Sequence, residues 1–122
     1  MAPLAPEVGD ERDLPSLLAR ARARLEQGLG PEHPGRGLTS PPGDSAVDLF
    51  RAVLAIDPGH AEAREGLARI AAFYRERARI AFDRGFYPAA RSIAEDGLKA
   101  DPEDRELLEI KARAEDRLSN AP

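Results

Sequence analysis

The sequence predicts an all-α protein, and three observations favour that class. Apolar residues recur at three- and four-residue steps over several segments, which is the period of an amphipathic helix. No segment shows the apolar–polar alternation of a half-buried strand. Hydrophobic residues make up 42% and charged residues 33% of the 122 residues, an ordinary balance for a soluble helical protein. We therefore expect antiparallel helical hairpins around a modest core.

The composition also excludes some function classes. The net charge of -4 argues against a nucleic-acid partner, and no apolar run is long enough for insertion into a membrane. The absence of cysteine excludes disulfides, thiolate metal sites and a cysteine nucleophile. Aromatic residues are only 5% of the chain, so small side chains and close helix contacts must build the core.

We expect one helical domain over residues 13–119, preceded by a disordered tail at 1–12 that is rich in Pro, Gly and acidic residues. Asp13 suits a cap position, and Pro15 suits the first turn of the first helix. The second helix is capped by Asp44 or Ser45. The predicted helices span residues 13–27, 44–57, 60–84, 88–100 and 103–118, the last one acting as a capping helix.

Residues 28–43 read as a long loop. Gly28 is a natural stop for the first helix, and five Gly and four Pro between Gly28 and Gly43 exclude a regular element. A loop of this length in a compact domain indicates either a mobile segment or a segment with a function. It contains His33, whose only potential metal-ligating neighbour is Glu32, so a metal site is not expected there.

The same helix-ending motif occurs twice, in "LAIDPGHAEA" and "LKADPEDREL". In each, a helix ends in Leu-x-x-Asp-Pro and a new helix begins a few residues later. We expect each Asp to cap and each Pro, Pro58 and Pro102, to lie in the first turn of the next helix. Such self-similarity indicates stacked helical hairpins, with a generic small helical bundle as the alternative.

These residues resemble the second half of the tetratricopeptide repeat, which runs from Gly-x-Tyr through Ala and an aromatic to a closing Pro. The resemblance covers roughly residues 44–118 and implies a short right-handed superhelix of hairpins. The two closing prolines lie 44 residues apart, against about 34 in that family, and the extra residues fit in a lengthened helix at 60–84. Ala94 and Gly97 depart from the aromatic and Ala that the family prefers. The matching residues are Gly85, Tyr87, Ala90, Ala94, Gly97, Leu98 and Pro102, with an earlier copy at Ala46, Phe50, Val53, Leu54 and Pro58.

In this interpretation, "DRGFYPAARS" is the turn of a repeat. Gly85 permits the chain reversal, Phe86 and Tyr87 fill the space between paired helices, and Ala90 keeps the helices close. The stretch from Leu38 to Ile70 is also similar to short modules appended to larger bacterial proteins, including envelope proteins and protein kinases.

The resemblance implies a peptide-binding groove lined by the long helix and the C-terminal helix. Arg75 and Arg79 lie one turn apart and could hold a carboxylate, although Glu76 would oppose an anion. The alternative is a solvated face with a pair such as Glu76–Arg79, and core packing for Phe73. The expected partner-binding residues are Arg69, Phe73, Arg75, Glu76, Arg79, Asp83 and Arg113.

No active site is visible. The sequence has no phosphate loop, nucleophile elbow or metal-ligand spacing, and the acidic residues of the last helix alternate with basic ones. We expect no catalytic residue, no cofactor and no metal, and we expect His60 to be a capping or turn residue.

The expected function is a non-catalytic scaffold that binds a protein or peptide partner. Two alternatives remain open: a homodimerisation module, and a regulatory or targeting appendage of a larger bacterial enzyme or envelope protein. As written, the chain is expected to be soluble and cytoplasmic, or periplasmic if it is a fragment of an envelope protein.

Overall fold

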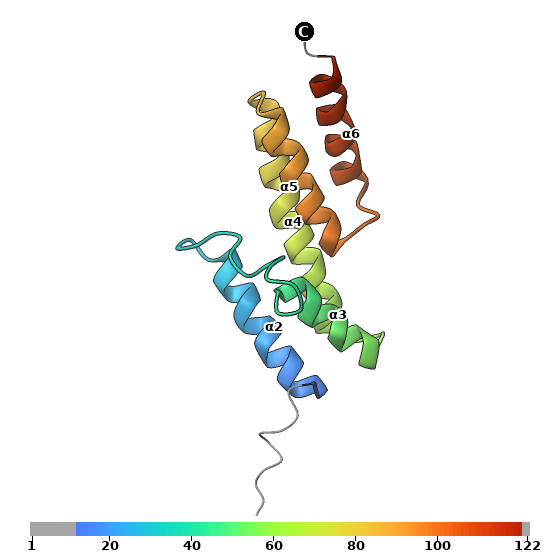
Figure 1. The fold of residues 1–122 in the computed structure, drawn as a ribbon. Coiled ribbons are helices and arrows are strands. Elements are labelled where there is room, and N and C mark those ends of the chain that lie inside the picture. The colour runs from blue at the N-terminus through green and yellow to red at the C-terminus, as the bar shows by residue number, and fades with distance from the viewer. Residues whose placement is uncertain (1–11, 121–122) are drawn as a thin grey trace, which may run out of the picture. The chain divides into compact units, whose positions relative to one another are not determined.

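The computed structural model describes residues 12–120, and over that range it contains helices and no strands (Figure 1). The all-α class is therefore confirmed. The tail expected at 1–12 lies, except for Arg12, outside the described residues. The helices are α2 (Leu14–Leu29), α3 (Ala46–Ile56), α4 (Ala61–Asp83), α5 (Tyr87–Ala100) and α6 (Arg105–Ser119).

The chain forms two compact units, one up to Gly66 and one from Leu67 onward. The first contains α2, α3 and the start of α4, and α2 packs against α3. The second contains the rest of α4 with α5 and α6, and α5 packs against α6. The long helix α4 thus contributes residues to both units, while the expectation of one domain over 13–119 stays a prediction.

The first helix begins as expected and ends later than expected. The Asp13 carboxylate accepts a hydrogen bond of 2.8 Å from the Ser16 backbone N–H, and Pro15 lies in the first turn. The prediction that Gly28 stops the helix was wrong, because α2 continues to Leu29 with Gly30 as its cap. Gly28 is buried within the helix, and a Cβ at this position would clash with the side chain of Leu38. Its glycine identity therefore serves a close contact between helix and loop.

At the start of α3, Ser45 is the cap. Its hydroxyl accepts a hydrogen bond of 3.1 Å from the Asp48 backbone N–H, and the Asp48 carboxylate accepts one of 2.7 Å from the Gly43 N–H. This is a variant of the capping box, in which the acidic residue bonds to the backbone N–H two residues before the N-cap. Asp44, the other expected cap, instead forms ion pairs with Arg20 and Arg24 of α2.

The two Asp-Pro segments adopt the same local structure. In the first, the Asp57 carboxylate accepts from the Gly59 N–H, the His60 N–H donates to the Asp57 carbonyl, and His60 Nδ1 accepts from the Ala63 N–H at 3.2 Å. The prediction of His60 as a capping residue is therefore confirmed.

The second segment repeats these bonds 44 residues later. The Asp101 carboxylate accepts from the Glu103 N–H, and Asp104 caps α6 by accepting from the Leu107 N–H at 2.9 Å. Placing Pro58 and Pro102 in the first turn of the next helix was wrong. Each proline lies in the turn, because the preceding Asp closes the earlier helix and the residue two after the proline caps the next.

The turn between α4 and α5 is the glycine reversal that the sequence predicts. Gly85 has φ +82°, its N–H donates to the Phe82 carbonyl, and the Phe86 N–H donates to the Ala81 carbonyl. This is the Schellman arrangement. The prediction that Phe86 fills the space between helices was wrong, since its side chain is 57% exposed while its backbone completes the turn. Tyr87 is half-buried, with its ring centroid 5.2 Å from that of Phe82.

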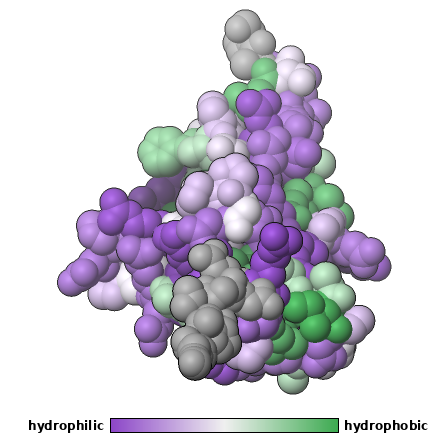
Figure 2. All heavy atoms as spheres, turned by 60° about the horizontal axis from the view of Figure 1, so that its bottom comes forward, coloured by the Kyte–Doolittle hydropathy of each residue, from purple (hydrophilic) through white to green (hydrophobic). Residues whose placement is uncertain are grey.

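Small residues form much of the core, which allows backbones to approach closely. A Cβ on Gly66 would lie 2.5 Å from the ring of Phe50, and one on Gly97 would lie 2.8 Å from Leu107. The face drawn in Figure 2 is mostly hydrophilic, with small hydrophobic areas. The apolar residues at three- and four-residue spacing along α4 are buried except for the half-buried Phe82: Ala63, Leu67, Ile70, Ala71, Tyr74, Ala78 and Ala81.

Candidate functional sites

A small hollow lies in the second unit, between the C-terminal half of α4 and α6. Its volume is about 170 Å³. Phe82 and Ile110 supply its apolar surface, and the other lining residues are charged. The residues that line it are Arg79, Phe82, Asp83, Glu106, Glu109, Ile110 and Arg113.

Arg75 is engaged by the protein itself. Its Nε and Nη2 atoms donate hydrogen bonds of 3.1 Å and 2.6 Å to Oδ2 of Asp104, the cap of α6. The Asp104 side chain is only 7% exposed. Burial raises the pKa of Asp104, but the hydrogen bonds from Arg75 and from the Leu107 N–H outweigh it and leave the pKa below its ordinary value. Arg75 therefore orients α6 against α4.

The remaining cations beside the hollow are also paired. Arg79 Nε donates to Glu106 Oε2 at 2.8 Å, and Arg113 Nη2 lies 2.9 Å from Glu109 Oε2, one turn away on α6. The sequence suggested that Arg79 pairs with Glu76, but in the structure Arg79 pairs with Glu106 on the neighbouring helix. Both pairs are exposed, so each contributes little stability on its own.

Of the predicted partner-binding residues, the hollow brings together Arg79, Asp83 and Arg113. Arg69 and Glu76 are exposed on α4 and do not line it. Phe73 is half-buried, with its ring edge-on to Tyr74 at 5.1 Å and the Arg77 guanidinium 4.5 Å from its centroid.

Four lining residues were missed by the sequence prediction: Phe82, Glu106, Glu109 and Ile110. Those on α6 are spaced at three and four residues with Arg113, which places them on one face of the helix. The spacing of these residues is visible in the sequence, but the sequence does not show that this face of α6 lies beside α4.

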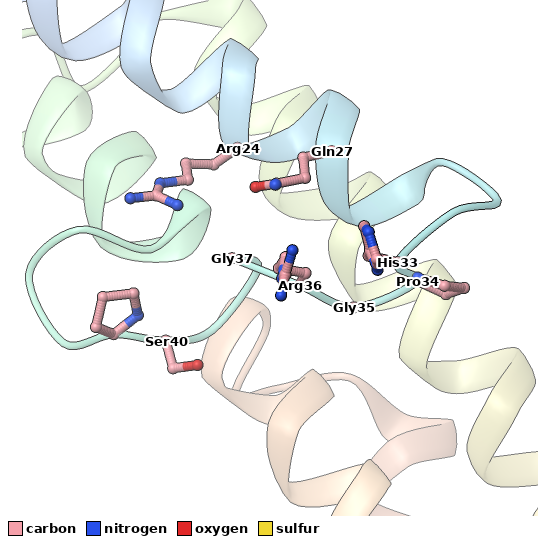
Figure 3. A pocket seen from close by; sticks show the side chains of 9 residues that line it. Arg24, Gln27, His33, Pro34, Gly35, Arg36, Gly37 and Ser40 are labelled. Carbon is pink, nitrogen blue, oxygen red and sulfur yellow. The ribbon is translucent and has the colours of Figure 1, made fainter.

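A larger hollow, of about 790 Å³, lies in the first unit between α2 and the loop that follows it. Figure 3 shows Arg24 and Gln27 reaching from α2 toward the loop segment that carries Arg36 and Gly37. His33 and Ser40 line it as well. The sequence prediction noted this loop as a segment of use or mobility and assigned it no binding residue.

Two further features concern metals and membranes. Within residues 12–120, no three His, Asp or Glu side chains lie together in a way that could hold a metal ion. Over the same range, no helix combines the length and the apolar character that crossing a bilayer requires.

Comparison with known proteins adds no relative. No protein-family model, no curated protein and no solved structure matches this chain.

Proposed function

We propose that this chain is a non-catalytic interaction module related to tetratricopeptide repeats, in which the groove between α4 and α6 binds a peptide or helix of a partner protein. The observation that carries the proposal is the hollow in that groove, where an apolar surface of Phe82 and Ile110 is bordered by charged side chains. Binding sites for peptides combine such apolar anchors with polar rims.

The duplicated hairpin supports the relationship to helical repeats. The two Asp-Pro turns share their hydrogen bonds. Phe50 on α3 lies against Gly66 on α4, whereas the positions 44 residues later carry Ala94 and Ile110. At these two positions the second hairpin thus carries a small residue where the first carries a large one, and the reverse.

The charges of the groove favour a particular partner chemistry. Arg79 and Arg113 already pair with Glu106 and Glu109, so an anionic ligand would have to displace internal carboxylates. Asp83 forms no ion pair among the described residues and is exposed. The groove therefore favours a segment that places an apolar side chain on Phe82 beside a Lys or Arg that reaches Asp83.

A random peptide library displayed on phage and panned on the purified chain tests this proposal. We expect selected peptides to carry an apolar residue close to a basic one. The Asp83→Lys variant should bind them at least about tenfold more weakly, since it replaces attraction by repulsion. The matched control is Glu115→Lys, which makes the same charge change on an exposed part of α6 outside the groove.

If Asp83→Lys and Glu115→Lys weaken binding equally, the effect comes from the net charge of the chain and not from the groove. Selection of acidic peptides would overturn the proposed groove chemistry. Because Asp83 is exposed at the last position of α4, where the helix dipole favours a cation over an anion, Asp83→Lys should not lower the melting temperature.

Self-association is a second candidate, favoured by large hydrophobic side chains on the surface. Ile56, Ile80, Phe86 and Leu108 are 53%, 43%, 57% and 46% exposed. Sedimentation equilibrium and melting across a range of protein concentrations separate the candidates. A melting temperature that rises with concentration would favour a dimer, and a concentration-independent one would favour the monomeric groove.

A further inference from the structure

The loop of the first unit is held in place by the helices that flank it. Leu38 is completely buried, and its side chain occupies the space that Gly28 leaves open on α2. The Gly35 N–H donates to the Gly28 carbonyl at 2.7 Å, and the Ala46 and Val47 N–H groups donate to the Gly37 and Leu38 carbonyls at 2.8 Å and 3.0 Å. The hollow between this loop and α2 is therefore formed before any ligand arrives.

Glycine at position 37 brings the loop backbone close to α2. Gly37 has φ +77°, a conformation that side chains disfavour, and a Cβ there would lie 3.1 Å from Arg24 Cδ and 3.4 Å from Gln27 Oε1. The Arg24 and Gln27 side chains thus lie directly over the loop backbone and face the same hollow as Arg36 (Figure 3).

The hollow is basic in a chain that is acidic overall. Arg24, Arg36 and His33 line it, and no carboxylate does. Asp44 pairs with Arg24 and with Arg20 and does not itself line the hollow. The hydrogen bonds from Arg24 and Arg20 hold the pKa of Asp44 below its usual range, and Asp44 in turn fixes the direction of the Arg24 side chain.

Arg36 is the member best placed to bind a ligand. It is exposed, and its side chain makes no ion pair or hydrogen bond with the described residues. Two neutral hydrogen-bonding side chains, the Gln27 amide and the Ser40 hydroxyl, line the same hollow. Guanidinium groups bind phosphate through two parallel hydrogen bonds, and neutral donors complete such a site.

We propose that this hollow is a binding site for a phosphate monoester, held by Arg36 with Gln27 and Ser40 and by the Arg24 N–H groups that its pair with Asp44 leaves unused. Its volume is about 790 Å³ and it is widely open to solvent, so it admits a phosphorylated side chain as well as a small phosphate ester. A nucleic-acid strand is a poor fit, because the lining contains no Phe, Tyr or Trp for base stacking and the chain as a whole is acidic. The site is independent of the groove in the second unit.

The proposal is tested by titrating the full chain with inorganic phosphate, glucose 6-phosphate or a phosphoserine peptide at constant ionic strength. The chemical shifts of the backbone amides are followed by NMR. We expect the amides of Arg24, Gln27 and the 33–41 segment to shift. The Arg36→Ala variant should bind at least about tenfold more weakly, and Arg36→Lys should fall between, because it keeps the charge and loses the paired hydrogen bonds.

The matched control is Arg91→Ala, which removes an exposed arginine from α5. Preference for glucose 6-phosphate would assign the site to a small metabolite, and preference for the peptide would assign it to a phosphorylated protein; either supports the site. Equal weakening by Arg36→Ala and Arg91→Ala, equal binding of acetate, or no shift at roughly 10 mM phosphate ester would overturn it.

Discussion

Arg75 of α4 donates two hydrogen bonds to the one carboxylate oxygen of Asp104 that is not used in capping α6. Asp104 Oδ2 receives Arg75 Nε and Nη2, while Oδ1 receives the Leu107 N–H. One nearly buried carboxylate therefore begins a helix and fixes that helix to its neighbour. Arg75, which the sequence suggested as a ligand-binding cation, therefore has a structural role, and substitutions at this ion pair should affect stability.

Removal of the Asp104 charge should destabilise the second unit. The Asp104→Asn variant keeps an N-cap acceptor but weakens the charge-assisted bonds from Arg75, and we expect a loss of about 1–2 kcal/mol. Asp104→Ala removes the cap as well and should cost about 2–4 kcal/mol. Urea denaturation monitored by circular dichroism measures both. Equal stability of Asp104→Asn and the parent chain would contradict the role of the ion pair.

Acid should destabilise the protein through its paired carboxylates. The pKa values of Asp104 and Asp44 lie below the ordinary 3.8, and that of Glu62 lies below 4.5 because of its hydrogen bond from Arg22. A depressed folded-state pKa contributes stability that is complete above the unfolded value and is lost as pH falls through the folded value.

The free energy of unfolding should therefore be insensitive to these groups at about pH 5–7 and should fall below about pH 4. Denaturation midpoints measured across this range test the sign. In Asp104→Asn the acid decline should be shallower, because one of the contributing groups is gone. A decline of the same steepness in that variant would show that Asp104 does not take part.

The contact of Gly66 with Phe50 should make a methyl group costly there. Gly66→Ala gains helix propensity of about 1 kcal/mol but places a Cβ against a buried ring, so we expect a net loss of about 1–2 kcal/mol. Adding Phe50→Leu should recover part of that loss, since the smaller side chain makes room. Gly59→Ala, where a Cβ meets nothing within 4 Å, is the control and should not show this penalty. If the double variant loses as much stability as the sum of the two single variants, the two residues do not interact and the contact is contradicted.

Periodicity alone was enough to predict the all-α class, because helical periodicity depends on residues close in the sequence. The glycine reversal at Gly85 was predictable for the same reason. Leu38 was missed because a single leucine among glycines and prolines has no periodic neighbours, yet it is completely buried. Its burial depends on Gly28, ten residues earlier, which the sequence pattern suggested as a stop.

The ion partners of Arg75 and Arg79 lie 29 and 27 residues away. Helix periodicity places each of these cations on a face of α4 but does not reveal which helix covers that face. The binding chemistry expected for the groove changed accordingly. Two arginines that could hold a carboxylate are already occupied, and the unpaired group among the predicted residues beside the hollow is the carboxylate of Asp83.

The most direct test of the proposed groove is a map of backbone amide shifts on addition of a selected apolar–basic peptide. The proposal predicts shifts concentrated at residues 79–83 on α4 and 106–113 on α6, and their loss in the Asp83→Lys variant. Shifts concentrated elsewhere, or the same shifts at the same affinity in that variant, would contradict it.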